Sequence, residues 1–230
     1  MQVYFAAYFK TKIIMKTKII FLTIMLLAIL PGCLVKSLHP YYTEKDLVFK
    51  EELPGNWSGK DSSGWEISRH MKKTGMFNPE TPDKAYDITY TDSKGSSKFI
   101  AHLFQLDKQL YIDFYPEGDA GNTDLGSFHY IQAHSLARLT VSKNTLTIQW
   151  FNEEWLMNLF NENRIRIAHE RIPYDLDDQN PDRDQVILTA PTADLQKFIL
   201  KYGKDPNAFK EEKNKSDYTF VLSRKLPNQK

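Results

Sequence analysis

The sequence has 230 residues and a single cysteine, Cys33. One cysteine excludes an intramolecular disulfide framework and any cysteine-rich zinc module. Neither sign of charge is in excess, because 30 Lys and Arg stand against 29 Asp and Glu, so there is no basic footprint for nucleic acid. The longest apolar run, residues 19–30, is shorter than the roughly 20 residues that span a bilayer as a helix. The 41% hydrophobic and 26% charged residues indicate a globular domain and argue against disorder, collagen, a coiled coil or a polytopic membrane protein.

Sequence motifs of common enzyme classes are also missing. The chain contains no Gly-x-Ser-x-Gly nucleophile turn, no phosphate-binding glycine loop and no His-Glu-x-x-His zinc motif. We therefore expect neither catalytic residues nor a cofactor.

The six histidines are the remaining candidates for a metal site or a general base. His129 and His134 are five residues apart, so they point to opposite faces of a continuous strand and cannot share an ion. His102 alternates with apolar residues, which predicts a core histidine with satisfied hydrogen bonds. A zinc triad of His102, His134 and His169 is conceivable, but no spacing supports it, and we predict no metal.

The most suggestive polar stretch is residues 175–184. Its alternating oxygen side chains resemble the first ligands of a calcium loop; they are Asp178, Asn180, Asp182 and Asp184. Arg183 stands where that loop requires glycine, and Thr189 stands where its bidentate glutamate belongs. A solvated acidic loop is the better interpretation.

The N-terminal segment has the order of a secretory signal peptide. Four lysines precede the apolar run 19–30, and small residues follow it; the lysines are Lys10, Lys12, Lys16 and Lys18. Met15 is an alternative start, which would make residues 1–14 an upstream misreading.

Leu30-Pro31-Gly32-Cys33 resembles the lipobox of bacterial lipoproteins. The resemblance implies that residues 1–32 are removed and that Cys33 becomes the lipidated first residue, with fatty acids such as palmitate. A buried core thiol and an uncleaved anchor helix are the alternatives. Each buried CH₂ of an acyl chain adds about 0.8 kcal/mol, so several chains hold a protein on a membrane almost permanently. Leu34 and Val35 show no Asp-type inner-membrane retention signal, so we expect a cell-envelope protein on the outer rather than the inner membrane.

The mature chain is long enough for one domain with a real core. Removing residues 1–32 removes four lysines, which leaves 26 basic against 29 acidic residues. Residues 33–52 suggest the lipidated cysteine and a tether, although the aromatic segment 39–46 could pack on the domain. Residues 53–230 suggest a single β-rich globular domain.

Beyond the tether, turn signals alternate with short runs of β-forming residues. Leu110, Ile112 and Phe114 alternate with polar or aromatic neighbours at a period of two, which is typical of a strand. Asp107-Lys108 predicts a tight hairpin turn without the usual glycine. Strands are expected near residues 64–70, 85–91, 99–106, 110–115, 131–141, 146–150, 165–170, 185–189 and 218–223.

Two helices interrupt this pattern. Asn152 can cap a helix over residues 153–161, whose apolar side chains share one face. Thr192 can cap a second helix, which Gly203 ends. Asp205-Pro206 predicts a short third turn.

Nine or ten short antiparallel strands must protect their edges, and closure into a barrel does so completely. Gly55-Asn56-Trp57, expected just ahead of the first strand, resembles the Gly-x-Trp opening of lipocalins. In that family the tryptophan closes the bottom of an eight-stranded barrel that holds an apolar ligand. We therefore predict a mainly β fold, an antiparallel barrel or strongly curved sheet of lipocalin-like form, with two or three short helices. Residues 38–46 and 188–196 are similar to segments of uncharacterised bacterial lipoproteins, which implies no activity.

The leading functional hypothesis is a lipid-anchored, non-catalytic envelope protein that binds a small apolar ligand or a partner at the membrane surface. Fourteen Phe, twelve Tyr and four Trp could line a ligand pocket, although core packing explains most of them. Trp57, Trp65 and Tyr111 are the candidate lining residues. The alternative is a structural or assembly lipoprotein that docks on an envelope protein without a small-molecule ligand.

Overall fold

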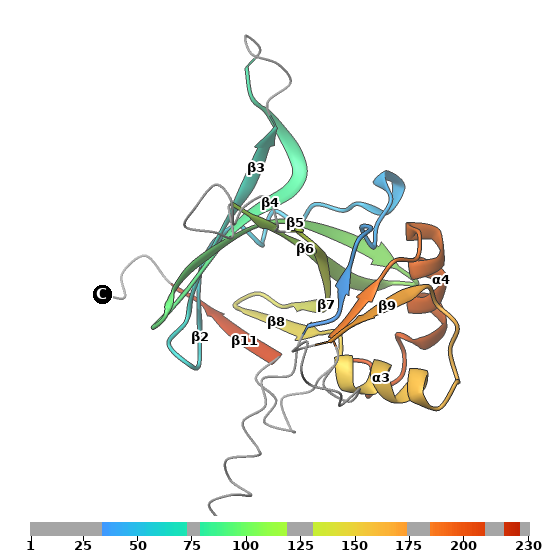
Figure 1. Cartoon of the computed structure of the whole chain (residues 1–230). Coiled ribbons are helices and arrows are strands. Elements are labelled where there is room, and N and C mark those ends of the chain that lie inside the picture. The colour runs from blue at the N-terminus through green and yellow to red at the C-terminus, as the bar shows by residue number, and fades with distance from the viewer. Residues whose placement is uncertain (1–33, 73–78, 119–130, 174–184, 210–218, 226–230) are drawn as a thin grey trace, which may run out of the picture. The chain divides into compact units, whose positions relative to one another are not determined.

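The computed structural model describes residues 34–72, 79–118, 131–173, 185–209 and 219–225 (Figure 1). Within them, eight antiparallel strands close into a barrel in the order β6-β5-β4-β3-β2-β11-β8-β7, and a β6–β7 pairing completes the ring. The strands are β2 Gly55–Gly59, β3 Gly64–Lys72, β4 Thr81–Asp92, β5 Gly95–Leu106, β6 Gln109–Glu117, β7 His134–Val141, β8 Thr145–Trp150 and β11 Thr219–Arg224. The predicted antiparallel barrel is confirmed.

The barrel is an up-and-down meander, because each strand from β2 to β8 pairs with the next one along the chain. The exception is β11, which returns from far along the sequence to pair with both β8 and β2. The tight turn at Asp107-Lys108 is confirmed, since both residues adopt positive φ (44° and 66°) and link β5 directly to β6. Two positive φ values are what a two-residue hairpin turn requires.

Inward-facing side chains fill the barrel. Alternation puts every second residue of each strand inside, where large apolar side chains are almost fully buried. These side chains include Trp57, Trp65, Tyr86, Ile88, Leu103, Ile112, Phe114, Leu139, Leu146, Ile148 and Leu222.

A second core lies on the outer surface of the barrel wall. The segment between β8 and β11 forms α3 (Glu153–Asn161), β9 (His169–Ile172), β10 (Gln185–Leu188) and α4 (Thr192–Tyr202). Figure 1 shows both helices on the side of the barrel where β9 lies. Their apolar faces pack with outward-facing residues of β5, β6 and β7, among them Phe104, Tyr111 and Leu136. Both faces of this part of the wall are therefore buried.

The two predicted helices are present, but only one has the expected cap. Asn152 caps α3, because its side chain accepts a hydrogen bond from the Trp155 backbone. The predicted cap of α4 is wrong, because Pro191 is the N-cap and the Thr192 hydroxyl donates to the Pro40 carbonyl; the helix ends at Gly203 as expected. Asp205-Pro206 forms a turn and no helix.

Residues 34–53, named here the strap, cross the outer wall before the chain enters β2. The strap contains β1 (Lys36–Ser37), which lies between β7 and β10, and a 3-10 turn, η1 (Glu44–Asp46). Val35 and Tyr41 are each 1% exposed, and Leu47 bridges Phe104 of β5. The segment expected as a tether thus packs along the domain from its first described residues.

Two strand positions also differ from expectation. Gly55–Gly59, expected ahead of the first strand, is itself strand β2 and pairs with β3. The strand expected over residues 165–170 is shifted to His169–Ile172, where it pairs with β10.

Candidate functional site

Trp57 and Trp65, two of the three predicted lining residues, lie opposite each other on β2 and β3 inside the barrel. Trp57 is 1% exposed; its Nε1–H donates to the Leu53 carbonyl at 3.0 Å. The Arg224 guanidinium lies 4.2 Å from the centre of the Trp57 ring and donates to the Pro54 and Glu52 carbonyls. Trp57 thus joins the strap end, the first barrel strand and the last one.

Trp65 is packed in the same way. Its ring makes edge contacts with Tyr90 and Phe220, and its Nε1–H donates to the Ser63 hydroxyl at 3.3 Å. Both indoles are surrounded by side chains of the barrel core. Core packing therefore accounts for their positions without a ligand.

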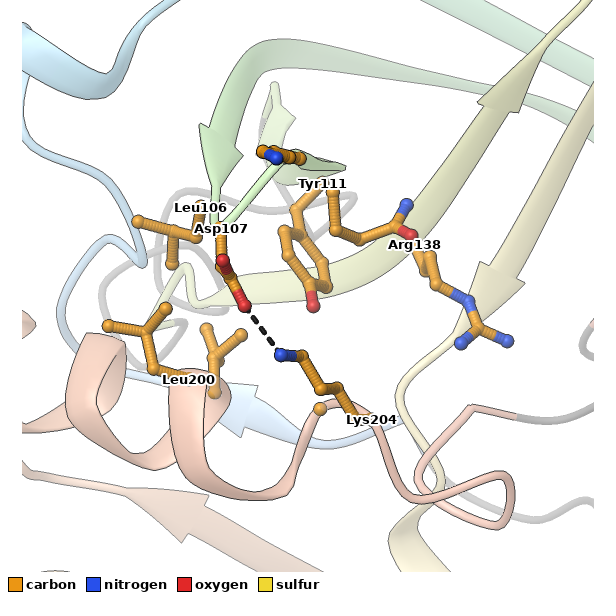
Figure 2. A pocket seen from close by; sticks show the side chains of 10 residues that line it. Leu106, Asp107, Tyr111, Arg138, Leu200 and Lys204 are labelled. Carbon is orange, nitrogen blue, oxygen red and sulfur yellow. Dashed lines mark ion pairs between the residues drawn. The ribbon is translucent and has the colours of Figure 1, made fainter.

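Tyr111 lies on the opposite face of the wall. It is next to Ile112 in β6, so its side chain points outward, away from the two tryptophans. There it lines a pocket of about 280 Å³ between the β5–β6 hairpin, β7 and α4 (Figure 2). The structure therefore separates the three predicted residues and places only Tyr111 at a pocket.

Part of the lining of this pocket is apolar. Tyr111 is joined by Leu106 from β5 and by Ile199 and Leu200 from α4. Leu200 is 47% exposed, which is high for a large apolar side chain. Leu106, Ile199 and Leu200 are not among the site residues predicted from the sequence. Ile199 shares the buried face of α4 with Leu195 and Phe198, and this helical spacing was the available signal.

Gly203 explains how α4 approaches Tyr111 so closely. A Cβ at this position would lie 2.8 Å from the Tyr111 hydroxyl and 2.6 Å from the Ile199 carbonyl. Only glycine leaves room for that hydroxyl beneath the end of the helix.

The rim of the pocket carries more positive than negative charge. Lys108, Arg138 and Lys204 stand against a single acid, Asp107. Asp107 pairs with Lys204 at 2.6 Å, as the dashed line in Figure 2 shows. Arg138 lies opposite Tyr111 in the β6–β7 register and donates through Nε to Gln149 at 3.0 Å. Burial raises the pKa of Tyr111, so its hydroxyl stays protonated as a possible donor.

A buried polar cluster lies elsewhere on the outer wall, where the strap crosses it. Asp113 is 1% exposed; one carboxylate oxygen accepts the Tyr41 backbone N–H at 2.8 Å, and the other lies 2.8 Å from His134 Nδ1. Burial raises the pKa of Asp113 against the opposing effect of His134. Both oxygens are used to hold the strap and His134 in place, which is a positioning arrangement.

His102 is the neighbour of Asp113 across β5 and β6. Its ring stacks on Tyr42 of the strap, with 4.4 Å between ring centres. The pKa of His102 is lowered to about 4; burial is the main cause, Asp83 opposes it, and His134 and His70 add to the lowering. His102 therefore remains neutral at physiological pH.

Replacing His102 by phenylalanine is expected to remove part of the acid sensitivity of the fold. Because the folded-state pKa lies below the ordinary value of 6.5, the unfolded chain binds the proton first, so His102 costs stability as pH falls from 6.5 towards 4. After a discount for partial exposure, wild type should lose about 1 to 2 kcal/mol more than His102→Phe over this window. Urea unfolding at pH 7, 5.5 and 4 measures the difference. Asp113 has a raised pKa, which acts on stability in the opposite sense, but it is present in both proteins. If the free energy of unfolding changed equally with pH in wild type and His102→Phe, His102 would not be a source of the acid sensitivity.

No three His, Cys, Asp or Glu side chains within the described ranges are grouped so that they could hold a metal ion. His134 contacts Asp113, and His169 stacks on Phe160 at 3.7 Å between ring centres. The acidic segment 175–184, His129 and Cys33 lie outside the described residues. In the part of the chain that the structure describes, no helix is both long and apolar enough to span a bilayer.

Comparison with known proteins gave no match to a protein-family model, to a curated protein or to a solved structure.

Proposed function

We propose that the chain is a lipid-anchored, non-catalytic protein of the cell envelope that binds a small, mainly apolar ligand in the pocket beneath α4. The lipobox-like Leu30-Pro31-Gly32-Cys33 supports the anchor and the envelope location, with the outer membrane favoured. The observation that carries the binding proposal is the combination of an apolar wall and a cationic rim around Tyr111.

The dimensions of the pocket define the ligand. Its volume of about 280 Å³ is just below the usual range of ligand sites, which starts near 300 Å³. The site therefore suits a short chain and not a large lipid. Leu106, Tyr111 and Ile199 would contact the apolar part of such a chain.

The charge of the rim favours an anionic end group. Asp107 pairs with Lys204, whereas Lys108 and Arg138 make no ion pair with a described acidic residue. Arg138 instead lies over the Phe209 ring, 5.1 Å from its centre. A short-chain carboxylate places its tail against Tyr111 and its charge towards these cations.

Two measurements test the binding proposal. Native mass spectrometry on the full protein, purified from membranes in mild detergent, should show an additional small mass that disappears on denaturation. Thermal unfolding should then shift upward with short straight-chain carboxylates and less with alcohols of equal length, because a ligand that binds only the folded state stabilises it. An apo mass with no shift by any carboxylate would contradict the proposal.

Leu200→Trp is expected to weaken carboxylate binding about tenfold, which corresponds to about 1.4 kcal/mol. The indole would occupy the pocket opening, and the site tolerates a larger side chain because Leu200 is half exposed. Lys197→Trp is the matched control, since Lys197 is exposed on the same helix and outside the pocket. Isothermal titration on both variants measures the difference. Equal affinities in both would place the ligand elsewhere.

A filled barrel favours the second candidate function, an assembly lipoprotein that docks on another envelope protein without a small ligand. Under that function neither Leu200→Trp nor Lys197→Trp binds carboxylates in the titration, and wild type does not bind them either. A cross-linker placed at Leu200 would then capture one defined protein in intact envelopes.

A further inference from the structure

Strand β1 belongs to a three-strand extension of the barrel sheet, in which it pairs with β10, and β10 pairs with β9. One face of this extension is buried. Val35, Val186 and Leu188 point into the core beneath the helices. Side chains alternate along a strand, so the intervening residues point to the other face.

The opposite face, named here the open face, consists of two rows of side chains. The register aligns Lys36 with Ile187 and Glu170 in one row, and it aligns Gln185 with Ile172 in the other. Ile172 is 47% exposed, and Glu170 is exposed as well. Lys36 Nζ donates to Gln185 Oε1 at 2.8 Å, which ties β1 to β10 across this face.

The lipobox cysteine immediately precedes this face along the chain. Cys33 is bonded to Leu34, and consecutive Cα atoms are about 3.8 Å apart. Val35 is 1% exposed, and β1 is paired on both sides, so the chain has no free length between the lipobox cysteine and the folded domain. A lipid on Cys33 would hold the start of β1 within a few ångströms of the bilayer.

We infer that the open face lies against the phospholipid surface of the membrane that carries the anchor. This inference rests on the proposed lipidation of Cys33. Ile172 and Ile187 offer apolar side chains to the boundary between head groups and acyl chains. The Lys36 stem can lie along that boundary with its ammonium among phosphates. The domain would thus have one fixed orientation on the membrane.

Site-directed labelling tests the orientation. Because Cys33 is the only native cysteine and would be acylated, one introduced thiol can be labelled alone. Ile172→Cys and Glu170→Cys report on the open face. Ser93→Cys, in the exposed turn between β4 and β5, is the control, because it lies on neither β9 nor a strand that pairs with β9. Each full-length protein is purified from membranes, labelled with a polarity-sensitive fluorophore and reconstituted into phosphatidylethanolamine–phosphatidylglycerol vesicles that contain a head-group spin-labelled lipid.

The expected result is a blue-shifted and strongly quenched emission at positions 172 and 170, with unshifted emission at position 93. Co-sedimentation with vesicles is measured on the same samples. Protein that sediments while all three positions behave alike overturns the orientation and leaves the anchor intact. Protein that stays in the supernatant overturns the proposed lipidation, and the orientation with it.

Discussion

Replacing Cys33 by alanine is expected to abolish incorporation of a labelled fatty acid completely, whereas the wild-type chain is labelled and remains with the membrane at high salt. The reason is chemical, since the thiol of Cys33 is the only one in the chain and the lipobox resemblance makes it the attachment point. Removing the acyl chains removes about 0.8 kcal/mol for every buried CH₂. Metabolic labelling with an alkyne palmitate, followed by mass spectrometry of the N-terminal peptide, measures the effect.

Lys36→Gln is the matched control, because it changes a nearby residue and leaves the lipobox cysteine in place. It should be labelled like wild type. Membrane sedimentation alone is a weaker readout, since an unprocessed signal peptide can also hold a protein on the membrane. Labelled fatty acid on the Cys33→Ala chain would show that the attachment point is another residue.

Trp57→Ala is expected to destabilise the fold by about 3 to 5 kcal/mol, the usual range for removing a buried tryptophan. Three contacts are lost together: the surrounding core, the Leu53 carbonyl and the Arg224 guanidinium. For a chain of this length the loss corresponds to a fall in Tm of roughly 6 to 20 °C. Urea unfolding followed by circular dichroism gives the free energy.

Trp57→Phe separates packing from hydrogen bonding. The phenyl ring keeps an aromatic surface under Arg224, while the Leu53 carbonyl loses its donor. Leaving one buried acceptor unpaired costs about 1 to 3 kcal/mol, so this variant should fall between wild type and Trp57→Ala. A Trp57→Ala free energy within about 1 kcal/mol of wild type would mean that the barrel end collapses to fill the space.

Local patterns predicted most of the barrel strands, because alternation of apolar residues depends on only a few neighbours. Strand β6 shows what alternation alone cannot predict, namely which face of a strand points into the barrel. Tyr111 and Ile112 are both buried, one beneath α4 and the other inside the barrel. When both faces are covered, periodicity identifies a strand but cannot say which face is the interior. The alternation of β6 alone therefore cannot separate Tyr111 from the two interior tryptophans.

The pocket could not be predicted because its residues come from segments distant in sequence. Leu106, Arg138 and Lys204 are brought together only when the segment between β8 and β11 folds back onto the outer wall. β1 was missed for a similar reason. With two residues it is too short to show alternation, and it is a strand only because β7 and β10 flank it.

The position of β11 has a consequence for the order of folding. Its pairing partners β2 and β8 come earlier in the chain, and Arg224 bonds to Pro54 across 170 residues of sequence. A chain that is synthesised from its N-terminus cannot close the barrel until β11 has emerged. Until then β2 and β8 present open edges, which are templates for intermolecular pairing. Contacts of such long range also slow folding, so we expect the segment between β8 and β11 to delay closure relative to a barrel whose last strand follows β8 directly.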